Sequence, residues 1–85
     1  ALAADYGSEG IRVNCLIPGY IKTQMTEHSF SDPELSMERV ERSMLGRWGK
    51  PKDLVGAAIF LASDAAKFVT GSDLIVDGGW SSKGL

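Results

Sequence analysis

Three apolar segments stand out along the chain, and glycine or proline lies just beyond each of them. Residues 1–6 are rich in alanine and leucine and predict the end of a helix. Residues 11–17 predict a strand, and residues 72–76 predict a second, shorter strand. The residues that end these segments are Gly7 and Gly10, Pro18 and Gly19, and Asp77, Gly78 and Gly79.

Two helices are predicted between the strands. The first spans about residues 33–44, because Asp32 is a favourable N-cap and Pro33 suits the first helical position. Ser31 and Glu34 offer a competing capping box one residue earlier, which leaves two possible starts.

The second predicted helix spans about residues 51–63 and has almost no polar face. A helix that is apolar nearly all round must be covered on most sides. Gly56 lies inside it, where glycine disfavours the helix by about 1 kcal/mol relative to alanine. Close packing of another backbone against this helix would explain that glycine.

The order of helix end, strand, loop, two helices and strand implies a parallel crossover, and hence an α/β sheet. Two short parallel strands are not a stable sheet, and parallel strands need cover on both faces. We therefore expect the 85 residues to be part of a larger sheet.

The composition is that of an ordinary globular protein and argues against several functions. The chain has 9 Lys and Arg against 11 Asp and Glu, a net charge of −2 that is unfavourable for nucleic-acid binding. One cysteine cannot form an intrachain disulfide, and no apolar run approaches the length of a membrane span. Residues 1–5 show no signal peptide and no initiator methionine, so we expect the N-terminal part of the protein to be absent. The mild net charge and the single cysteine are those expected of a cytoplasmic protein.

The candidate site follows the strand predicted over residues 11–17. Ligands of open α/β sheets bind beyond the carboxyl ends of the strands, and the loop at Pro18 occupies such an end. Gly19 lets the backbone approach a ligand closely. The Ile21 amide and the Thr23 hydroxyl could then hold a planar polar group such as a carboxamide. The alternative is an ordinary strand-to-loop turn, which spacing alone favours.

Collinear segments along the chain resemble the short-chain dehydrogenase/reductase family. Residues 10–23 resemble its Pro-Gly-x-x-x-Thr segment, and residues 46–55 its Gly-Arg-x-Gly-x-Pro-x-Asp/Glu segment. Residues 60–64, 70–71 and 76–79 complete the pattern, which covers nearly the whole chain at family spacing. Within the family, the segments are similar to those of sugar-acid dehydrogenases of the gluconate 5-dehydrogenase type, polyol dehydrogenases and 3-oxoacyl reductases.

The resemblance implies a Rossmann-like, doubly wound parallel sheet, of which residues 1–85 are the C-terminal part. It implies an oxidoreductase that uses NAD or NADP to interconvert an alcohol and a carbonyl in a small-molecule substrate such as a sugar, sugar acid or polyol. The cofactor-binding residues would be Pro18, Gly19, Ile21 and Thr23, which position the nicotinamide ring rather than perform acid–base chemistry.

The resemblance also implies a substrate lid within residues 23–50, centred on residues 25–45, that closes over the site and excludes water. The pliable apolar fillers of this lid would be Met25, Met37 and Met44. A homo-oligomer, either a dimer or a tetramer, is implied through the helix 51–63 and the strand 72–76. No nucleic-acid or membrane partner is expected.

The catalytic Tyr-x-x-x-Lys pair of the family is absent from these residues. Gly10 stands four residues after Tyr6, and Gln24 four residues after Tyr20. The glycine-rich phosphate loop is absent as well. No catalytic or metal-binding residue is therefore predicted, and the 85 residues by themselves should be inactive.

Two other functions were compatible with parts of the pattern. A non-catalytic interaction or regulatory domain could keep the scaffold and lack the active site, and the sequence upstream of Ala1 would discriminate. A helix-turn-helix DNA-binding protein is excluded, because the second helix has no polar recognition face.

Individual residues outside these motifs receive mostly structural interpretations. Cys15 is expected to be an inert thiol in a buried strand, and Asn14 to bond backbone across strands or loops. His28 is expected to be a solvated loop residue rather than a substrate contact. Trp80 either caps the substrate pocket of its own or a neighbouring subunit, or packs on the surface.

Overall fold

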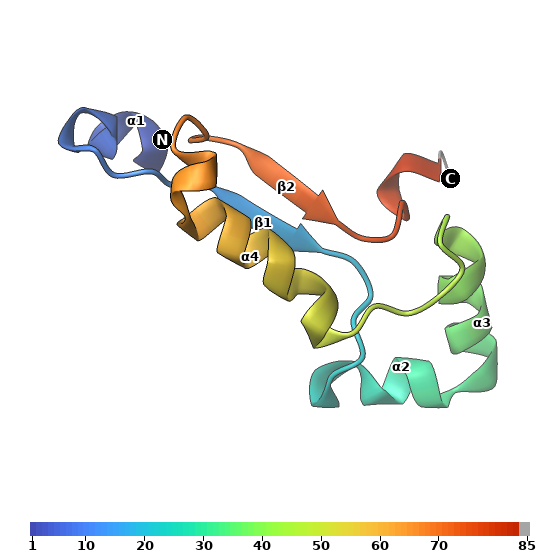
Figure 1. The fold of residues 1–85 in the computed structure, drawn as a ribbon. Helices are drawn as coiled ribbons and strands as arrows, with labels where there is room; N and C mark the ends of the chain where they lie inside the picture. Colours follow the sequence, from blue (N-terminus) through green and yellow to red (C-terminus); the bar gives the residue numbers. More distant parts are fainter. Residues whose placement is uncertain (84–85) are drawn as a thin grey trace.

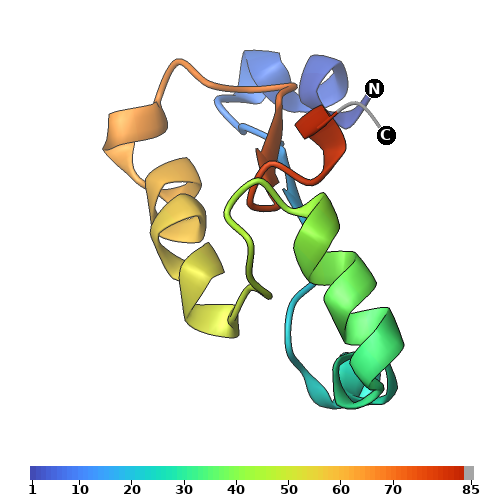
Figure 2. The same ribbon diagram turned by 90° about the vertical axis from the view of Figure 1, so that its right-hand side faces the viewer.

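A computed structural model describes residues 1–83 of the chain. Two parallel strands lie at its centre, α4 runs beside them, and α2 and α3 lie beyond their carboxyl ends (Figures 1 and 2). The helices and strands are α1 (Leu2–Tyr6), β1 (Cys15–Pro18), α2 (Glu27–Ser31), α3 (Pro33–Arg42), α4 (Val55–Ala62) and β2 (Asp73–Val76). Short 3₁₀ turns occupy Gly7–Glu9, Gln24–Thr26, Pro51–Leu54, Asp64–Ala66 and Ser81–Lys83.

The two strands confirm the predicted α/β arrangement. β1 and β2 pair in parallel, with Cys15 opposite Asp73 and Pro18 opposite Val76. The connection between them carries α2, α3 and α4, as a parallel crossover requires. Figure 2 shows α4 on one side of the strands and α3 on the other, below their carboxyl ends.

β1 is shorter than the strand predicted over residues 11–17, and side chains as well as backbone bonds hold the residues that lead into it. The Asn14 amide donates to the Val69 carbonyl (3.0 Å) and accepts from the Ser72 N–H (3.0 Å). Arg12 also donates to the Val69 carbonyl (3.3 Å). The cross-strand role predicted for Asn14 is thus confirmed.

The start of α3 confirms one of the two predicted caps. The Asp32 carboxylate accepts the N–H groups of Glu34 (3.0 Å) and Leu35 (3.3 Å). Ser31 is instead the last residue of α2, so the start one residue earlier is wrong. α3 ends at Arg42, two residues before the predicted end, and the backbone is extended at Ser43.

The remaining boundaries also differ from the sequence pattern. The apolar helix predicted over residues 51–63 is a 3₁₀ turn followed by α4. Residues 24–31 form helical turns that the pattern missed, so the exposed His28 lies on a helix rather than in a loop. Gly10, with φ +77°, ends the first helical segment, whereas Gly7 keeps a right-handed helical backbone.

The buried core of the described residues is small. Trp48, at 6% exposure, and Ala66, at 1%, are their buried apolar side chains. Cys15 is exposed, contrary to the buried thiol expected from the sequence, because no element of the described chain covers that part of the sheet. The apolar helix α4 likewise leaves large side chains in solvent, with Ile59 at 62% exposure.

Candidate functional site

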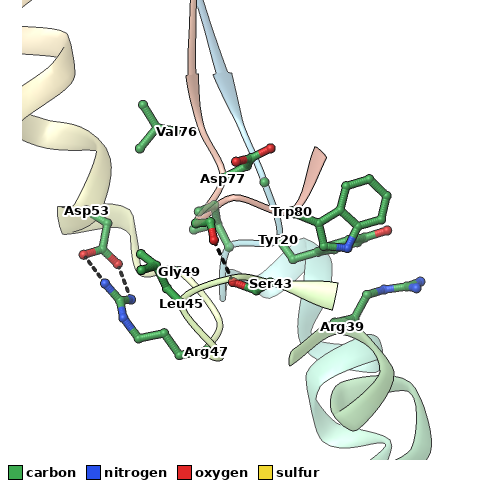
Figure 3. A pocket seen from close by; sticks show the side chains of 13 residues that line it. Tyr20, Arg39, Ser43, Leu45, Arg47, Gly49, Asp53, Val76, Asp77 and Trp80 are labelled. Carbon is green, nitrogen blue, oxygen red and sulfur yellow. Dashed lines mark hydrogen bonds and ion pairs between the residues drawn. The ribbon is translucent and has the colours of Figure 1, made fainter. Parts of the chain in front are cut away.

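A cavity of about 220 Å³ lies beyond the carboxyl ends of β1 and β2 (Figure 3). This is the edge at which open α/β sheets bind ligands. Its walls come from the loop after β1, from α3 and the chain that follows it, and from the turn after β2. Segments that are distant in the sequence therefore meet around one space.

The loop after β1 is fixed by a short parallel bridge to Gly49. The Gly49 N–H donates to the Tyr20 carbonyl (2.9 Å), and the Lys22 N–H donates to the Gly49 carbonyl (2.9 Å). These two bonds flank Ile21 without using its N–H group. Ile21 lines the cavity, so its N–H group is held at the cavity wall as a hydrogen-bond donor.

Gly19 makes the closest backbone approach in the site. A Cβ atom on Gly19 would lie 2.6 Å from Cβ and 2.8 Å from Cα of Asp77. The Gly19 N–H donates to the Val76 carbonyl (3.2 Å), which brings the two chains together. Pro18 lines a neighbouring hollow of about 360 Å³ and not the first cavity. Gly19 lines both spaces and lies at the boundary between them.

Thr23 lies outside the cavity wall and is exposed. Its N–H donates to the Thr26 hydroxyl oxygen (2.9 Å), and the Thr26 hydroxyl donates to the Ile21 carbonyl. The Thr23 hydroxyl oxygen is 3.5 Å from that of Thr26, a long and weak contact. Thr26 thus shapes the loop through hydrogen bonds with the Thr23 N–H and carbonyl, whereas the Thr23 hydroxyl is only weakly engaged.

The three methionines of the predicted lid occupy different positions. Met44 packs against the turn after β2, since a Cβ atom on Gly79 would lie 2.7 Å from its side chain. Met25, at 95% exposure, and Met37, at 63%, point into solvent and do not line the cavity. None of the three lines the cavity, and Met44, at 57% exposure, reaches only the turn beside it.

A cluster of aromatic rings joins the lid to the loop after β1. Tyr20 makes edge-to-face contacts with Trp80 (5.4 Å between centroids) and with Trp48 (5.8 Å). Trp48 also packs against Phe30 of α2 (5.8 Å), and its Nε1–H donates to the Ser36 hydroxyl oxygen of α3 (2.9 Å). Trp80 lines the cavity, so of the two predicted positions, at a pocket or packed on the surface, the structure favours the first.

Arg47 and Asp53 form a bidentate ion pair at one side of the cavity. The two bonds are 2.9 and 3.2 Å, and the Lys50 N–H donates to the same carboxylate (2.7 Å). The Arg47 hydrogen bonds, followed by that of the Lys50 N–H, lower the pKa of Asp53 from 3.8 to about 2. The stabilisation from this carboxylate is therefore present above pH 3.8 and is lost as the pH falls towards 2.

Asp77 is held by the turn that follows β2. It accepts hydrogen bonds from the Ser81 hydroxyl (2.7 Å), the Ser81 N–H (3.0 Å) and the Gly79 N–H (2.9 Å). The Ser81 bonds are the main cause of the lowered pKa of this carboxyl group. Asp77 thus organises the turn rather than offering a free carboxylate to a ligand.

The chain after α3 is docked onto the same turn. The Gly78 carbonyl accepts the hydroxyl of the buried Ser43 (3.2 Å) and the N–H of Leu45 (3.0 Å). Gly78 has φ +65°, which a residue with a side chain rarely adopts. This contact sets the position of α3 relative to the sheet.

The sequence pointed to the loop after β1 but missed several side chains of the site. Tyr20, Trp48 and Arg39 come together although they belong to three separate segments. The Gly-Arg-x-Gly motif and the double glycine before Trp80 marked two of the contributing segments. No linear signal links Arg39 to Tyr20, because that contact depends on how α3 is docked.

Two kinds of feature are absent from the part of the chain that the structure describes. Residues 1–83 contain no group of three or more acidic, histidine or cysteine side chains that could hold a metal ion. None of their helices has the length and apolar character needed to cross a membrane.

Comparison with curated proteins identifies sugar-acid dehydrogenases among the relatives. The chain is 46% identical to 2-dehydro-3-deoxy-D-gluconate 5-dehydrogenase of Pseudoalteromonas atlantica, with 98% of this chain and 33% of that protein aligned. It is 47% identical to gluconate 5-dehydrogenase of Gluconobacter oxydans, with 92% of this chain and 30% of that protein aligned. The chain thus spans about a third of the length of these relatives.

Solved structures agree with this relationship. A gluconate 5-dehydrogenase from Burkholderia cenocepacia in complex with NADP and tartrate superposes with a TM-score of 0.93 at 44% identity, covering 95% of this chain and 32% of that one. A 4-hydroxyisoleucine dehydrogenase complexed with NADH gives a TM-score of 0.91 at 41% identity, covering 95% of this chain and 33% of that one.

A family model described as enoyl-(acyl carrier protein) reductase matches residues 1–81, almost the full chain. This match and the dehydrogenase relatives confirm the resemblance seen in the sequence motifs. The chain therefore belongs to the short-chain dehydrogenase/reductase family.

Proposed function

We propose that these residues are the C-terminal part of an NAD(P)-dependent oxidoreductase that interconverts an alcohol and a carbonyl in a sugar, sugar acid or polyol. The observation that carries this proposal is the superposition of 95% of the chain on a gluconate 5-dehydrogenase that binds NADP. The NADH-bound neighbour keeps NAD as an equal candidate for the cofactor.

In this proposal Pro18, Gly19, Ile21 and Thr23 position the nicotinamide ring. The Ile21 N–H, which the bridge to Gly49 leaves unused, and the weakly engaged Thr23 hydroxyl suit the two ends of a carboxamide group. Gly19 lines the cavity wall and so places its main chain beside the proposed ring position. The cofactor supplies hydride transfer when bound, and these residues fix which ring face meets the substrate.

Residues 23–50 form the substrate lid in this proposal. The chain after α3 is tied to the Gly78 carbonyl, which gives the lid a fixed base on the sheet. The exposed Met25 and Met37 provide adaptable apolar surface that substrate or lid closure would cover. Closure would exclude water from the hydride-transfer step.

Replacing Thr23 by valine in the full-length protein is expected to weaken cofactor binding by about 1–2 kcal/mol, because one polar contact to the carboxamide is lost. Thr23→Ser retains the hydroxyl and should bind the cofactor almost as the unmodified protein does. Titration of NADH or NADPH fluorescence measures both variants. An unchanged affinity in Thr23→Val would remove this residue from the proposed site.

Turnover tests the function as a whole. The full-length protein should reduce NAD or NADP in the presence of a sugar acid or polyol, whereas the 85 residues alone should not. A full-length protein that neither binds nor reduces either nicotinamide cofactor would contradict the proposal and favour a non-catalytic interaction domain.

We also propose that α4 and β2 form the interface of a homo-oligomer. The apolar Val55, Ile59 and Phe60 of α4 and Ile75 of β2 are exposed in the described chain, and burying such surface favours association. Ile59→Glu is expected to shift sedimentation towards smaller species. Met37→Glu, at a similarly exposed site outside α4, should leave the assembly intact. A full-length protein that is already monomeric at micromolar concentration would refute the interface.

A further inference from the structure

We infer that Arg39 binds a carboxylate in the cavity, so that the substrate of the proposed enzyme is a sugar acid in preference to a neutral polyol. This inference rests on the proposed function, since it specifies what the same site accepts.

Within residues 1–83, Arg39 is the cationic side chain of the cavity wall that has no anionic partner. Four charged side chains line the space, and Arg47 is paired with Asp53. Asp77 is occupied by three hydrogen bonds from its own turn. Arg39 makes no ion pair or hydrogen bond within residues 1–83, and its buried Nε lacks a partner. Arg39 therefore provides the unpaired positive charge for an anion that enters the cavity.

The Arg39 side chain is supported in a fixed place. Its guanidinium lies over the Tyr20 ring, 4.4 Å from the centroid, and Tyr20 is itself packed between Trp48 and Trp80. Stacking leaves the edge of a guanidinium free for the planar, paired hydrogen bonds that a carboxylate accepts. Figure 3 shows Arg39, Tyr20 and Trp80 on one side of the cavity and the Arg47–Asp53 pair on the other.

Neighbouring groups favour an anion at the same place. The buried Nε1–H of Trp80 lacks an acceptor, and Trp80 lines the same cavity. Arg42, one helical turn after Arg39, lies 5.8 Å from the Trp80 ring centroid and adds a second positive charge nearby. The cavity has a volume of about 220 Å³, which is large enough for a small polar acid.

The test compares D-gluconate with D-glucitol, in which a hydroxymethyl group replaces the carboxylate, on the full-length enzyme. Calorimetric binding to the enzyme–cofactor complex and steady-state KM are measured for the unmodified protein, for Arg39→Gln and for Lys52→Gln. The last variant removes the same charge from an exposed position outside the cavity. Arg39→Gln should weaken gluconate binding about 10- to 100-fold, as expected for lost charge-assisted hydrogen bonds.

Glucitol and cofactor binding should change less than about twofold in Arg39→Gln, and Lys52→Gln should match the unmodified enzyme. Equal gluconate affinity in Arg39→Gln and the unmodified protein would overturn the inference, as would no preference of the unmodified protein for gluconate over glucitol. If Arg39→Gln lost affinity for NADPH alone, Arg39 would contact a cofactor phosphate instead, which would also overturn the inference. Failure of the proposed function is distinct, because it appears as no binding and no reduction of NAD or NADP, while calorimetric titration of gluconate into the protein without cofactor still compares Arg39→Gln with the unmodified protein.

Discussion

Replacing Trp48 by alanine is expected to lower the unfolding free energy of the full-length protein by about 3–5 kcal/mol. Trp48 is the largest buried side chain of the described chain, and it contacts Tyr20 from the loop after β1 and Phe30 from α2. Its removal leaves a cavity where three segments meet and also breaks the hydrogen bond to Ser36. Urea-induced unfolding with an unchanged m-value would measure this loss.

Trp48→Phe and Ser36→Ala separate the two contributions. The phenylalanine retains a ring but cannot donate to Ser36, so it should cost much less than alanine. Ser36→Ala removes the acceptor alone and should cost about 1–3 kcal/mol, because the buried indole N–H is left unpaired. If Trp48→Ala were no more destabilising than Ser36→Ala, the ring would not be a core element.

The second large effect is expected for Gly19→Ala. The new methyl group would lie within 2.8 Å of Cα and 2.6 Å of Cβ of Asp77, and a main-chain neighbour cannot rotate away. Relief requires the loop after β1 to move from the turn after β2, which should cost about 1–3 kcal/mol of unfolding free energy. Because the same loop holds the proposed nicotinamide site, cofactor affinity should fall as well.

Gly7→Ala is the matched control for this substitution. Gly7 has a right-handed helical backbone, with φ −58°, and nothing lies within 4 Å of the position that a Cβ atom would take. Alanine there should leave stability unchanged or raise it by up to about 1 kcal/mol. Denaturation midpoints of Gly19→Ala and Gly7→Ala that moved equally would show that the close approach to Asp77 has no energetic consequence.

The local sequence pattern predicted which segments form helices and strands better than it predicted where these elements begin and end. The cap at Asp32 was correct, because a capping side chain and Pro33 act within one helical turn. The predicted strand 11–17 was too long at its N-terminal end, since Arg12 and Asn14 bond to a loop more than fifty residues away. The turns at 24–31 were missed because they carry no regular apolar period.

The candidate site was predicted only in part, because the sequence pattern locates the loop after β1 but not the side chains that meet it in the fold. Gly19 and Ile21 line the cavity, as the position of their loop after a strand suggested, whereas Pro18 and Thr23 lie outside its wall. Their cofactor-binding role remains a prediction. The expectation of a buried Cys15 was wrong for these residues, because burial of a strand depends on which elements cover it.

The sequence by itself determined the two strands, the helices α3 and α4 between them, the parallel α/β character and membership of the family, because turn residues, apolar runs and motif spacing are local properties of the chain. The tertiary structure alone decided which charges of the cavity are paired, and which one has no ion pair within residues 1–83. Arg39 reaches Tyr20 because the chain after α3 is anchored to the Gly78 carbonyl, 35 residues away from Ser43. Such a contact depends on the docking of α3 against the sheet, which no local pattern encodes.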